Sequence, residues 1–136
     1  MHDQTKFVFI SRKFLECRKY LSPQATCVWI ELVSYWFLKE GSLTERTHDY
    51  VKPSIKTISN FTGVSENVVR KTFKELKILG FITKIVAEKN PDGSNKPNVY
   101  YLDENPKNII EKLPELEKFQ NKRRSKNTIK EDGWGE

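Results

Sequence analysis

A row of hydrogen-bonding side chains recurs three and four residues apart between positions 66 and 79. The row consists of Asn67, Arg70, Lys71 and Lys74. On a helix with about 100° between residues these share one side. The other side is apolar, with Thr72 and Leu79 at its edge, and consists of Val69, Phe73 and Leu76. Cations and amides pair with phosphates and base edges, arginine best with guanine and asparagine with adenine. The same pattern is also typical of the solvated face of an amphipathic helix.

Other reactive side chains lack the spacing that catalysis or metal binding needs. Cys17 and Cys27 form no CxxC pair, and two cysteines do not indicate a disulfide framework. His2 lies at the N-terminus and His48 in a polar stretch that is expected to be a loop, so we expect neither to act in acid-base or nucleophilic catalysis. Motifs of phosphate-binding loops, zinc proteases and serine hydrolases are absent from the sequence. The sequence therefore predicts a protein that is not an enzyme and needs no cofactor.

Composition favours one basic domain. The 136 residues carry a net charge of +6 and a pI near 9.3, so polyanions are the natural partners. The most apolar run, residues 27–38, is too short to span a bilayer and contains Glu31. The N-terminus lacks the pattern of a secretory leader. We therefore expect a soluble, cytoplasmic chain without a membrane partner.

The element that positions the cationic row is a helix with clear end signals. Ser65 is a good N-cap residue, and its hydroxyl can accept from the first free amides of a helix over 66–79. Gly80 follows as a residue that tolerates the left-handed conformation at a helix end. The boundaries of this helix are thus set by local chemistry.

A shorter helix should precede it. Pro53 and Ser54 mark its start, Gly63 marks its end, and Ile55, Ile58 and Phe61 are expected to face the interior. Two helices joined by a turn of three or four residues match a helix-turn-helix, in which the second helix enters the major groove.

A hairpin is expected immediately afterwards. Residues 81–88 and 98–102 read as strands, and Asp92-Gly93 between them is a strong turn signal. Such a hairpin would form a wing, with Lys89, Asn90, Asn95 and Lys96 near its tip.

The N-terminal third gives weaker signals. Residues 6–11 alternate as in a short strand, and residues 11–20 suggest a brief helix or turn with Phe14 and Leu15 inward. A longer helix should begin after Ser22, with Pro23 at its first position, and end near Glu40-Gly41. Its inward positions are Ala25, Val28, Trp29, Leu32 and Trp36. Residues 41–53 are expected to form a loop.

Taken together, the stretches "LSPQATCVWIEL", "PSIKTISNFTGVSENVVRKTFKELKILGFI" and "NVYYL" resemble winged helix-turn-helix domains of plasmid and phage replication initiators, replisome organisers and related small regulators. The resemblance covers residues 7–102. It implies an α+β fold, a three-helix core with a β-hairpin wing, and binding to double-stranded DNA.

The remainder is expected to extend this domain. We predict a DNA-binding domain over 1–102, a helical extension over 103–122, and a basic, polar tail without regular structure over 123–136. Within the extension, a short helix over 106–112 should break at Leu113-Pro114. The tail contains KRRSK, either solvated or an arm that adds phosphate affinity, and Trp134.

The leading hypothesis is a sequence-specific DNA-binding protein of a plasmid, phage or other mobile element, acting at an origin or operator. It would serve replication, transcription or conjugation, as a homodimer or a cooperative assembly on repeats. The alternative is an adaptor that uses the same fold to dock a protein; a third is the DNA-binding part of an enzyme. The candidate DNA-contacting residues are Ser54, Lys56, Ser65, Glu66, Asn67, Arg70, Lys71, Lys74, Lys89, Asn95 and Lys96.

Overall fold

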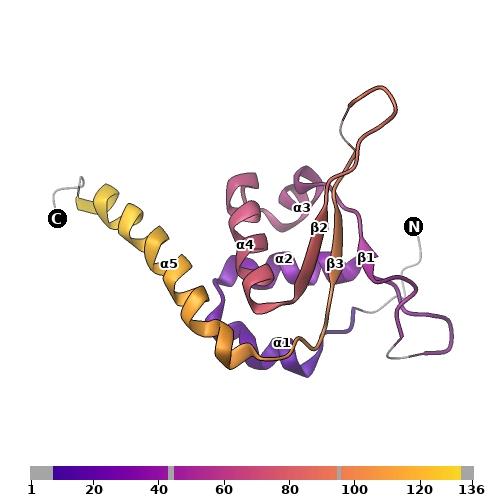
Figure 1. The fold of residues 1–136 in the computed structure, drawn as a ribbon, viewed down its shortest axis with the longest axis horizontal. Helices are drawn as coiled ribbons and strands as arrows, with labels where there is room; N and C mark the ends of the chain where they lie inside the picture. The colour runs from indigo at the N-terminus through magenta and orange to yellow at the C-terminus, as the bar shows by residue number, and fades with distance from the viewer. Residues whose placement is uncertain (1–7, 43–44, 95, 133–136) are drawn as a thin grey trace.

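The computed structural model describes residues 8–42, 45–94 and 96–132, with the backbone alone over 123–132. Helices and a small antiparallel sheet make up an α+β fold, as the sequence predicts (Figure 1). The elements are α1 (Arg12–Cys17), the 3₁₀ helix η1 (Arg18–Tyr20), α2 (Pro23–Ser34), β1 (Tyr50–Val51), α3 (Ile55–Thr62), α4 (Glu66–Leu79), β2 (Ile82–Val86), β3 (Val99–Leu102) and α5 (Ile109–Asp132).

Side-chain caps begin four of these helices. Ser11, Ser22, Ser54 and Ser65 each precede a helix and accept a hydrogen bond from a backbone N–H in its first turn. Each serine thereby satisfies one of the amides that a helix start leaves free. The starts of α2, α3 and α4 thus lie where the sequence predicts them.

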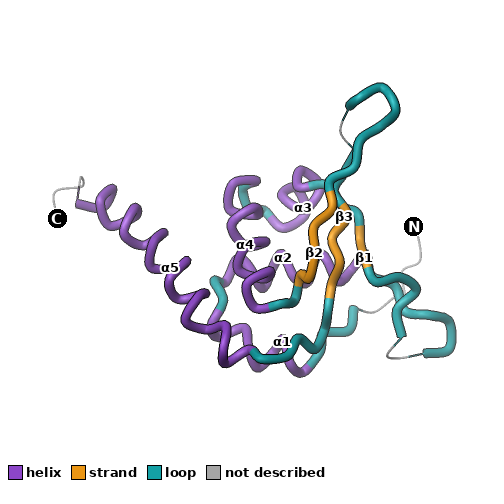
Figure 2. Tube along the Cα trace, in the orientation of Figure 1, coloured by secondary structure: helices purple, strands orange, loops and turns teal. Residues whose placement is uncertain are grey.

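The sheet has the strand order β1-β3-β2, and all pairs are antiparallel. The three strands lie side by side, and the loop between β2 and β3 extends beyond the body of the molecule (Figure 2). Tyr101 of β3 is paired with Tyr50 of β1 and with Lys84 of β2. The segment expected to be a loop over 41–53 therefore supplies a third strand.

The core joins all layers through aromatic rings. Phe14 of α1 stacks on Trp29 of α2 with ring centroids 5.4 Å apart, and both rings contact the edge of Phe81 at 5.2 and 5.3 Å. These rings are fully buried, or nearly so. Such pairs add to the stabilisation that burial of their apolar area provides. These rings thus join α1 and α2 to the residue that links α4 to β2.

Several expectations for the N-terminal part are wrong. Residues 8–11 are not in a strand, and residues 6–7 lie outside the described part. Leu15 is exposed, although Phe14 is buried. The helix α2 ends at Ser34 rather than near residue 40, and Trp36 reaches the core from the loop that follows.

This loop is held by polar contacts around Arg46. The Arg46 guanidinium lies over the Trp36 ring, 4.8 Å from its centroid, and donates to the Trp36 carbonyl at 2.7 Å. It also pairs with the largely buried Glu104 at 2.8 Å. The Trp36 indole N–H donates to the His48 carbonyl. These contacts hold Trp36 in place beyond the end of α2, and they satisfy the carbonyls of Trp36 and His48.

Two expectations for helices elsewhere are also wrong. Phe61, expected in the interior, is 73% exposed. The helix α5 passes through Pro114 without the expected break and continues to Asp132, through residues for which the sequence predicts no regular structure. Residues 133–136, including Trp134, lie outside the described part.

Candidate nucleic-acid interface

The turn between α3 and α4 sets the direction of α4. Gly63 ends α3 in the left-handed conformation with φ 78°, and its N–H donates to the Ser59 carbonyl. The Thr62 hydroxyl accepts from the Val64 N–H at 3.2 Å, and Ser65 then caps α4. Because only glycine adopts such a φ without strain, the three-residue turn depends on Gly63.

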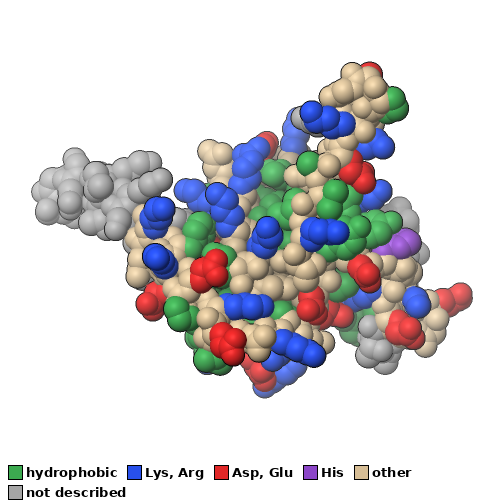
Figure 3. All heavy atoms as spheres, in the orientation of Figure 1, with side chains coloured by type: hydrophobic (Ala, Val, Ile, Leu, Met, Phe, Trp, Pro, Cys, Tyr) green, Lys and Arg blue, Asp and Glu red, His purple; other side chains and the backbone are tan. Residues whose placement is uncertain are grey.

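The outward face of α4 carries the predicted row. Asn67, Arg70, Lys71 and Lys74 are all exposed, and Figure 3 shows cationic side chains gathered over α4 and the hairpin. The inward face is buried, and it contains the predicted residues Val69, Thr72, Phe73, Leu76 and Leu79 together with Glu75, which the sequence interpretation did not place there. The sequence therefore predicts the outward face and the apolar part of the inward one.

The Arg70 guanidinium is positioned by its own helix. It donates to the Asn67 side-chain oxygen at 3.2 Å and lies 3.7 Å from the Glu66 carboxylate. Both contacts are solvent-exposed, and such pairs contribute only about 0.3–0.5 kcal/mol. Arg70 can therefore exchange these partners for a guanine edge or a phosphate at little cost.

The sheet lies beside this face. The Tyr100 ring of β3 contacts Phe73 of α4, with centroids 4.8 Å apart. Burial raises the pKa of Tyr100, while a hydrogen bond with Asn98 and the positive charge of Arg70 oppose that rise. The contact of the two rings therefore packs β3 against α4.

The hairpin tip is held by its own hydrogen bonds. The Asn90 N–H donates to the Ser94 carbonyl, and the Lys96 N–H donates to the Glu88 carbonyl. Hydrogen bonds from the Ser94 hydroxyl and backbone N–H hold the pKa of Asp92 below its usual value. Lys89 and Lys96 are exposed on this frame. The predicted residue Asn95 lies outside the described residues.

The other predicted residues divide into caps and surface groups. The Ser54 hydroxyl accepts from the Thr57 N–H at 3.0 Å and donates to the Thr57 hydroxyl, so it already has partners. The Ser65 hydroxyl accepts from the Val68 N–H at 3.4 Å. Lys56 is exposed on α3, and Glu66 is exposed at the start of α4.

Two groups near this surface were missed by the sequence interpretation. Lys84 of β2 is exposed and lies over the Tyr101 ring, 4.8 Å from its centroid. Its charge is the signal that would have found it, because alternation from the buried Ile82 places Lys84 inward, and the register of the strand shifts between these two residues. The exposed ring of Phe61 follows no such signal, because its apolar type predicts burial.

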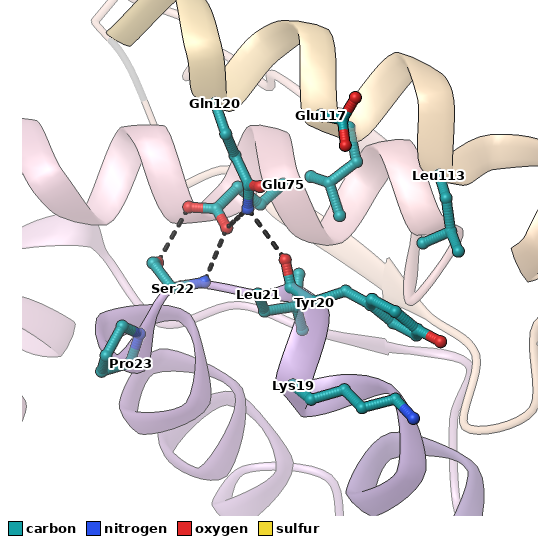
Figure 4. A pocket seen from close by; sticks show the side chains of 10 residues that line it. Lys19, Tyr20, Leu21, Ser22, Pro23, Glu75, Leu113, Glu117 and Gln120 are labelled. Atoms are coloured by element: carbon teal, nitrogen blue, oxygen red, sulfur yellow. Dashed lines mark hydrogen bonds between the residues drawn. The ribbon is translucent and has the colours of Figure 1, made fainter. Parts of the chain in front are cut away.

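A hollow of about 560 Å³ lies behind α4, between the start of α2 and α5 (Figure 4). Glu75 of α4 is fully buried at its wall and accepts from the Ser22 N–H at 2.9 Å and from the Ser22 hydroxyl at 2.8 Å. The Gln120 amide of α5 donates to the same carboxylate at 3.1 Å and to the Tyr20 carbonyl at 2.9 Å. The carboxylate therefore joins three helical segments.

The described residues also contain two cysteines and a histidine. They contain no group of three histidine, cysteine or acidic residues that could hold a metal ion. Cys17 is buried, which raises the pKa of its thiol, and Cys27 is exposed. The His48 ring stacks on Tyr50 with centroids 5.0 Å apart. Within the part of the chain that is described, none of the helices is long and apolar enough to cross a bilayer.

Comparisons with known proteins leave the surface to be judged on its geometry. A scan against protein-family models and searches of curated proteins and of solved structures found no match to this chain.

Proposed function

We propose that this chain is a winged helix-turn-helix protein that binds double-stranded DNA in a sequence-specific manner. In this proposal α3 and α4 form the helix-turn-helix and the β2–β3 hairpin forms the wing. It acts at an origin or operator of a plasmid, phage or other mobile element, in replication, transcription or conjugative DNA processing. It resides in the cytoplasm and performs no catalysis.

The observation that carries the proposal is the outward face of α4. An amide and three cations are exposed there, and the helix follows a tight turn. In a helix-turn-helix, the second helix enters the major groove, where Arg70 and Asn67 are suited to read guanine and adenine. Lys71 and Lys74 supply phosphate contacts, which give affinity but no sequence information.

The test uses a selection from a random double-stranded DNA library, followed by titration of the selected duplex. Arg70→Ala with Lys71→Ala should bring affinity for the selected duplex close to that for random DNA. A bidentate arginine–base contact provides about 1–3 kcal/mol of discrimination, which is roughly a 5- to 150-fold loss. Lys89→Ala with Lys96→Ala should weaken binding to all duplexes while preserving the selected consensus, because phosphate contacts carry no sequence information.

Thermal melting separates a loss of contacts from a loss of fold. Both residues are exposed, and alanine is a good helix former, so the variant should melt within a few degrees of the parent. Unchanged affinity in the Arg70 and Lys71 variant would reject α4 as the recognition helix.

The proposal includes assembly on DNA as a homodimer or as cooperative copies on repeats, because a recognition surface of this size commonly gains affinity that way. Titration of duplexes with one and two copies of the selected site measures it. Equal affinity per site on both would count against assembly.

A docking role is the second candidate, and the exposed Phe61 ring favours it. An aromatic ring on the surface is typical of the central residues of protein interfaces. A mainly apolar partner would not suit the neighbouring α4 face, since cores of interfaces are depleted in charge. Absence of any DNA binding in the selection would favour this role.

A further inference from the structure

The outer face of the sheet carries a line of side chains that crosses all three strands. Tyr101 of the central strand β3 is in register with Tyr50 of β1 on one side and with Lys84 of β2 on the other. Side chains of directly paired residues lie on the same face of a sheet. The two tyrosines are half-buried and Lys84 is exposed, and Figure 3 shows hydrophobic and cationic side chains side by side over the sheet. This face therefore belongs to the surface of the molecule.

The opposite face of the same strands is turned to the core. Val51 and Tyr100 pair with each other and are buried, and Ile82 is also buried. The register shift between Ile82 and Lys84 turns Lys84 to the other face. The core thus takes one face of the sheet and leaves the other to solvent.

Three aromatic rings, His48, Tyr50 and Tyr101, form what we call the aromatic platform. The His48 ring stacks on Tyr50 with centroids 5.0 Å apart and planes 17° from parallel. Tyr50 in turn contacts Tyr101, with centroids 5.6 Å apart. The His48 carbonyl accepts a hydrogen bond from the indole N–H of the buried Trp36, and the strand register holds the two tyrosines. The platform is therefore held in place by the fold itself.

Lysines lie over two of these rings. The Lys84 amino group is 4.8 Å from the Tyr101 centroid, and the Lys52 amino group is 5.5 Å from the Tyr50 centroid. Both lysines are exposed, and neither takes part in an ion pair between described side chains. The sequences of the three strands contain no acidic residue. The face thus combines aromatic rings with positive charge.

We propose that the outer face of the sheet binds a single-stranded polynucleotide, whose bases stack on the aromatic platform and whose phosphates pair with Lys52 and Lys84. Every base has a flat π-face, so such a platform accepts strands of any sequence. A duplex does not suit it, because the bases of a duplex are stacked on one another. The site shares no residue with the α4 face and goes beyond the proposed function, since it takes a single strand.

Binding requires the lysines to move off the rings. A cation above an exposed ring contributes less than a base stacked on it. The ammonium group of lysine is carried on a flexible four-carbon stem, so it can turn from the ring to a phosphate. The strand therefore replaces a weaker contact with a stronger one and gains a phosphate contact. A platform of this size stacks about two or three bases.

The first test measures binding of a single-stranded oligothymidine of about ten nucleotides by fluorescence anisotropy. Tyr101→Val removes the central ring and keeps a residue that favours strands. Tyr20→Val is the matched control, because Tyr20 is also half-buried and has the Lys19 amino group 5.2 Å from its centroid, outside the sheet. Tyr101→Val should weaken binding about 5- to 150-fold, and the control by less than about twofold.

Ring and charge are tested separately. Tyr101→Phe keeps the ring and should bind as the parent does. Lys52→Gln with Lys84→Gln should lower the slope of log affinity against log salt by about 1.4, because each phosphate contact to a single strand contributes about 0.7. Oligouridine of the same length distinguishes the source of the strand, since tighter binding of oligouridine or of oligothymidine assigns it to RNA or to DNA.

Thermal melting and titration of the duplex selected for α4 accompany each variant. Equal affinity of Tyr101→Val and Tyr20→Val for oligothymidine would overturn the inference. So would a loss of duplex affinity in Tyr101→Val as large as its loss of single-strand affinity, because the ring would then support the fold or the duplex site. If Tyr101→Val does not melt cooperatively, the lysine variant decides, and an unchanged salt slope rejects the platform.

The same titrations separate the inference from the proposed function. Arg70→Ala with Lys71→Ala should lose the selected duplex and keep oligothymidine. A parent protein that binds oligothymidine through the platform and binds no duplex would retain the inference and reject the proposed function. A parent that binds the selected duplex and no single strand would do the reverse.

Discussion

Replacing Glu75 with alanine would remove the carboxylate that joins α4 to the start of α2 and to α5. Three donors would lose this acceptor: the Ser22 N–H, the Ser22 hydroxyl and the Gln120 amide, at 2.9, 2.8 and 3.1 Å. The side chain is fully buried, so a small residue leaves space behind as well as unsatisfied groups. We therefore expect the Glu75→Ala substitution to cause a large loss of stability.

The magnitude follows from these contacts. A hydrogen bond to a charged group contributes about 1.5–3 kcal/mol, and three at the lower limit give about 4.5 kcal/mol. Removing a buried charge returns part of its desolvation cost, which reduces the loss. We expect a decrease of about 3 kcal/mol in the free energy of unfolding for Glu75→Ala, or about 10 °C in melting temperature.

Glu75→Gln should lower the free energy of unfolding by only about 1–2 kcal/mol. Its amide oxygen still accepts a hydrogen bond from Ser22 or Gln120, although the negative charge is lost. Lys74→Ala is the matched control on the neighbouring, exposed position and should change stability by less than about 0.5 kcal/mol. Urea unfolding followed by circular dichroism measures all three. A Glu75→Ala protein as stable as the Lys74→Ala protein would refute the role assigned to the carboxylate.

Two further predictions concern a helix end and a phenol. Gly80→Ala should destabilise by about 2–3 kcal/mol, because φ is +97° and the new Cβ would lie 3.0 Å from Pro106. Gly63→Ala, with φ +78° and open space around it, should cost only about 1 kcal/mol; equal losses in urea unfolding would contradict this reasoning. Burial, then a hydrogen bond and charge from Glu31, raise the pKa of Tyr35 to about 12. In the unfolded chain the Tyr35 phenol has a pKa near 10.0 and loses its proton first as the pH rises. The contribution of Tyr35 to folding stability, fully present below pH 10, should therefore be lost between pH 10 and about 12. Ultraviolet titration against Tyr35→Phe measures it, and a phenol that ionises near pH 10 would contradict the assignment.

The parts of the fold that sequence predicts are those set by local chemistry. The ends of α4 depend on a serine cap and a glycine at φ +97°, and both signals lie within one turn of the helix. The Asp92-Gly93 turn is likewise local, and Gly93 adopts φ +90°. The exposed face of α4 follows from helical periodicity alone.

The parts that sequence misses depend on distant partners. Glu75 is a charged residue near the edge of an amphipathic pattern, and its burial requires Ser22 and Gln120. The strand β1 is only two residues long and exists because β3 offers an edge to pair with. Neither arrangement leaves a periodic signal in the sequence.

Tertiary contacts also overrule local preferences in α5 and α2. Proline within a helix costs about 3 kcal/mol, yet α5 continues through Pro114 because Leu116 and Gln120 anchor the following turns. In α2 the helical spacing of Trp36 is misleading, since Arg46 and the His48 carbonyl hold this side chain from a loop. Near the candidate site, Phe61 was predicted to face the interior because it is apolar. Residue type alone does not show which face of α3 the rest of the fold covers.

The contacts of Gln120 have a consequence for the order in which the chain assembles during synthesis. Its partners, Glu75 and Tyr20, lie 45 and 100 residues earlier in the sequence. At 5–20 residues per second, a ribosome needs about 2–9 s to add the residues between Glu75 and Gln120. Throughout that interval α4 lacks one of its supporting helices, and of the donors seen in the folded protein only those of Ser22 are available to the Glu75 carboxylate. Docking of α5 therefore follows synthesis of α4 by seconds, and it supplies the last of these donors.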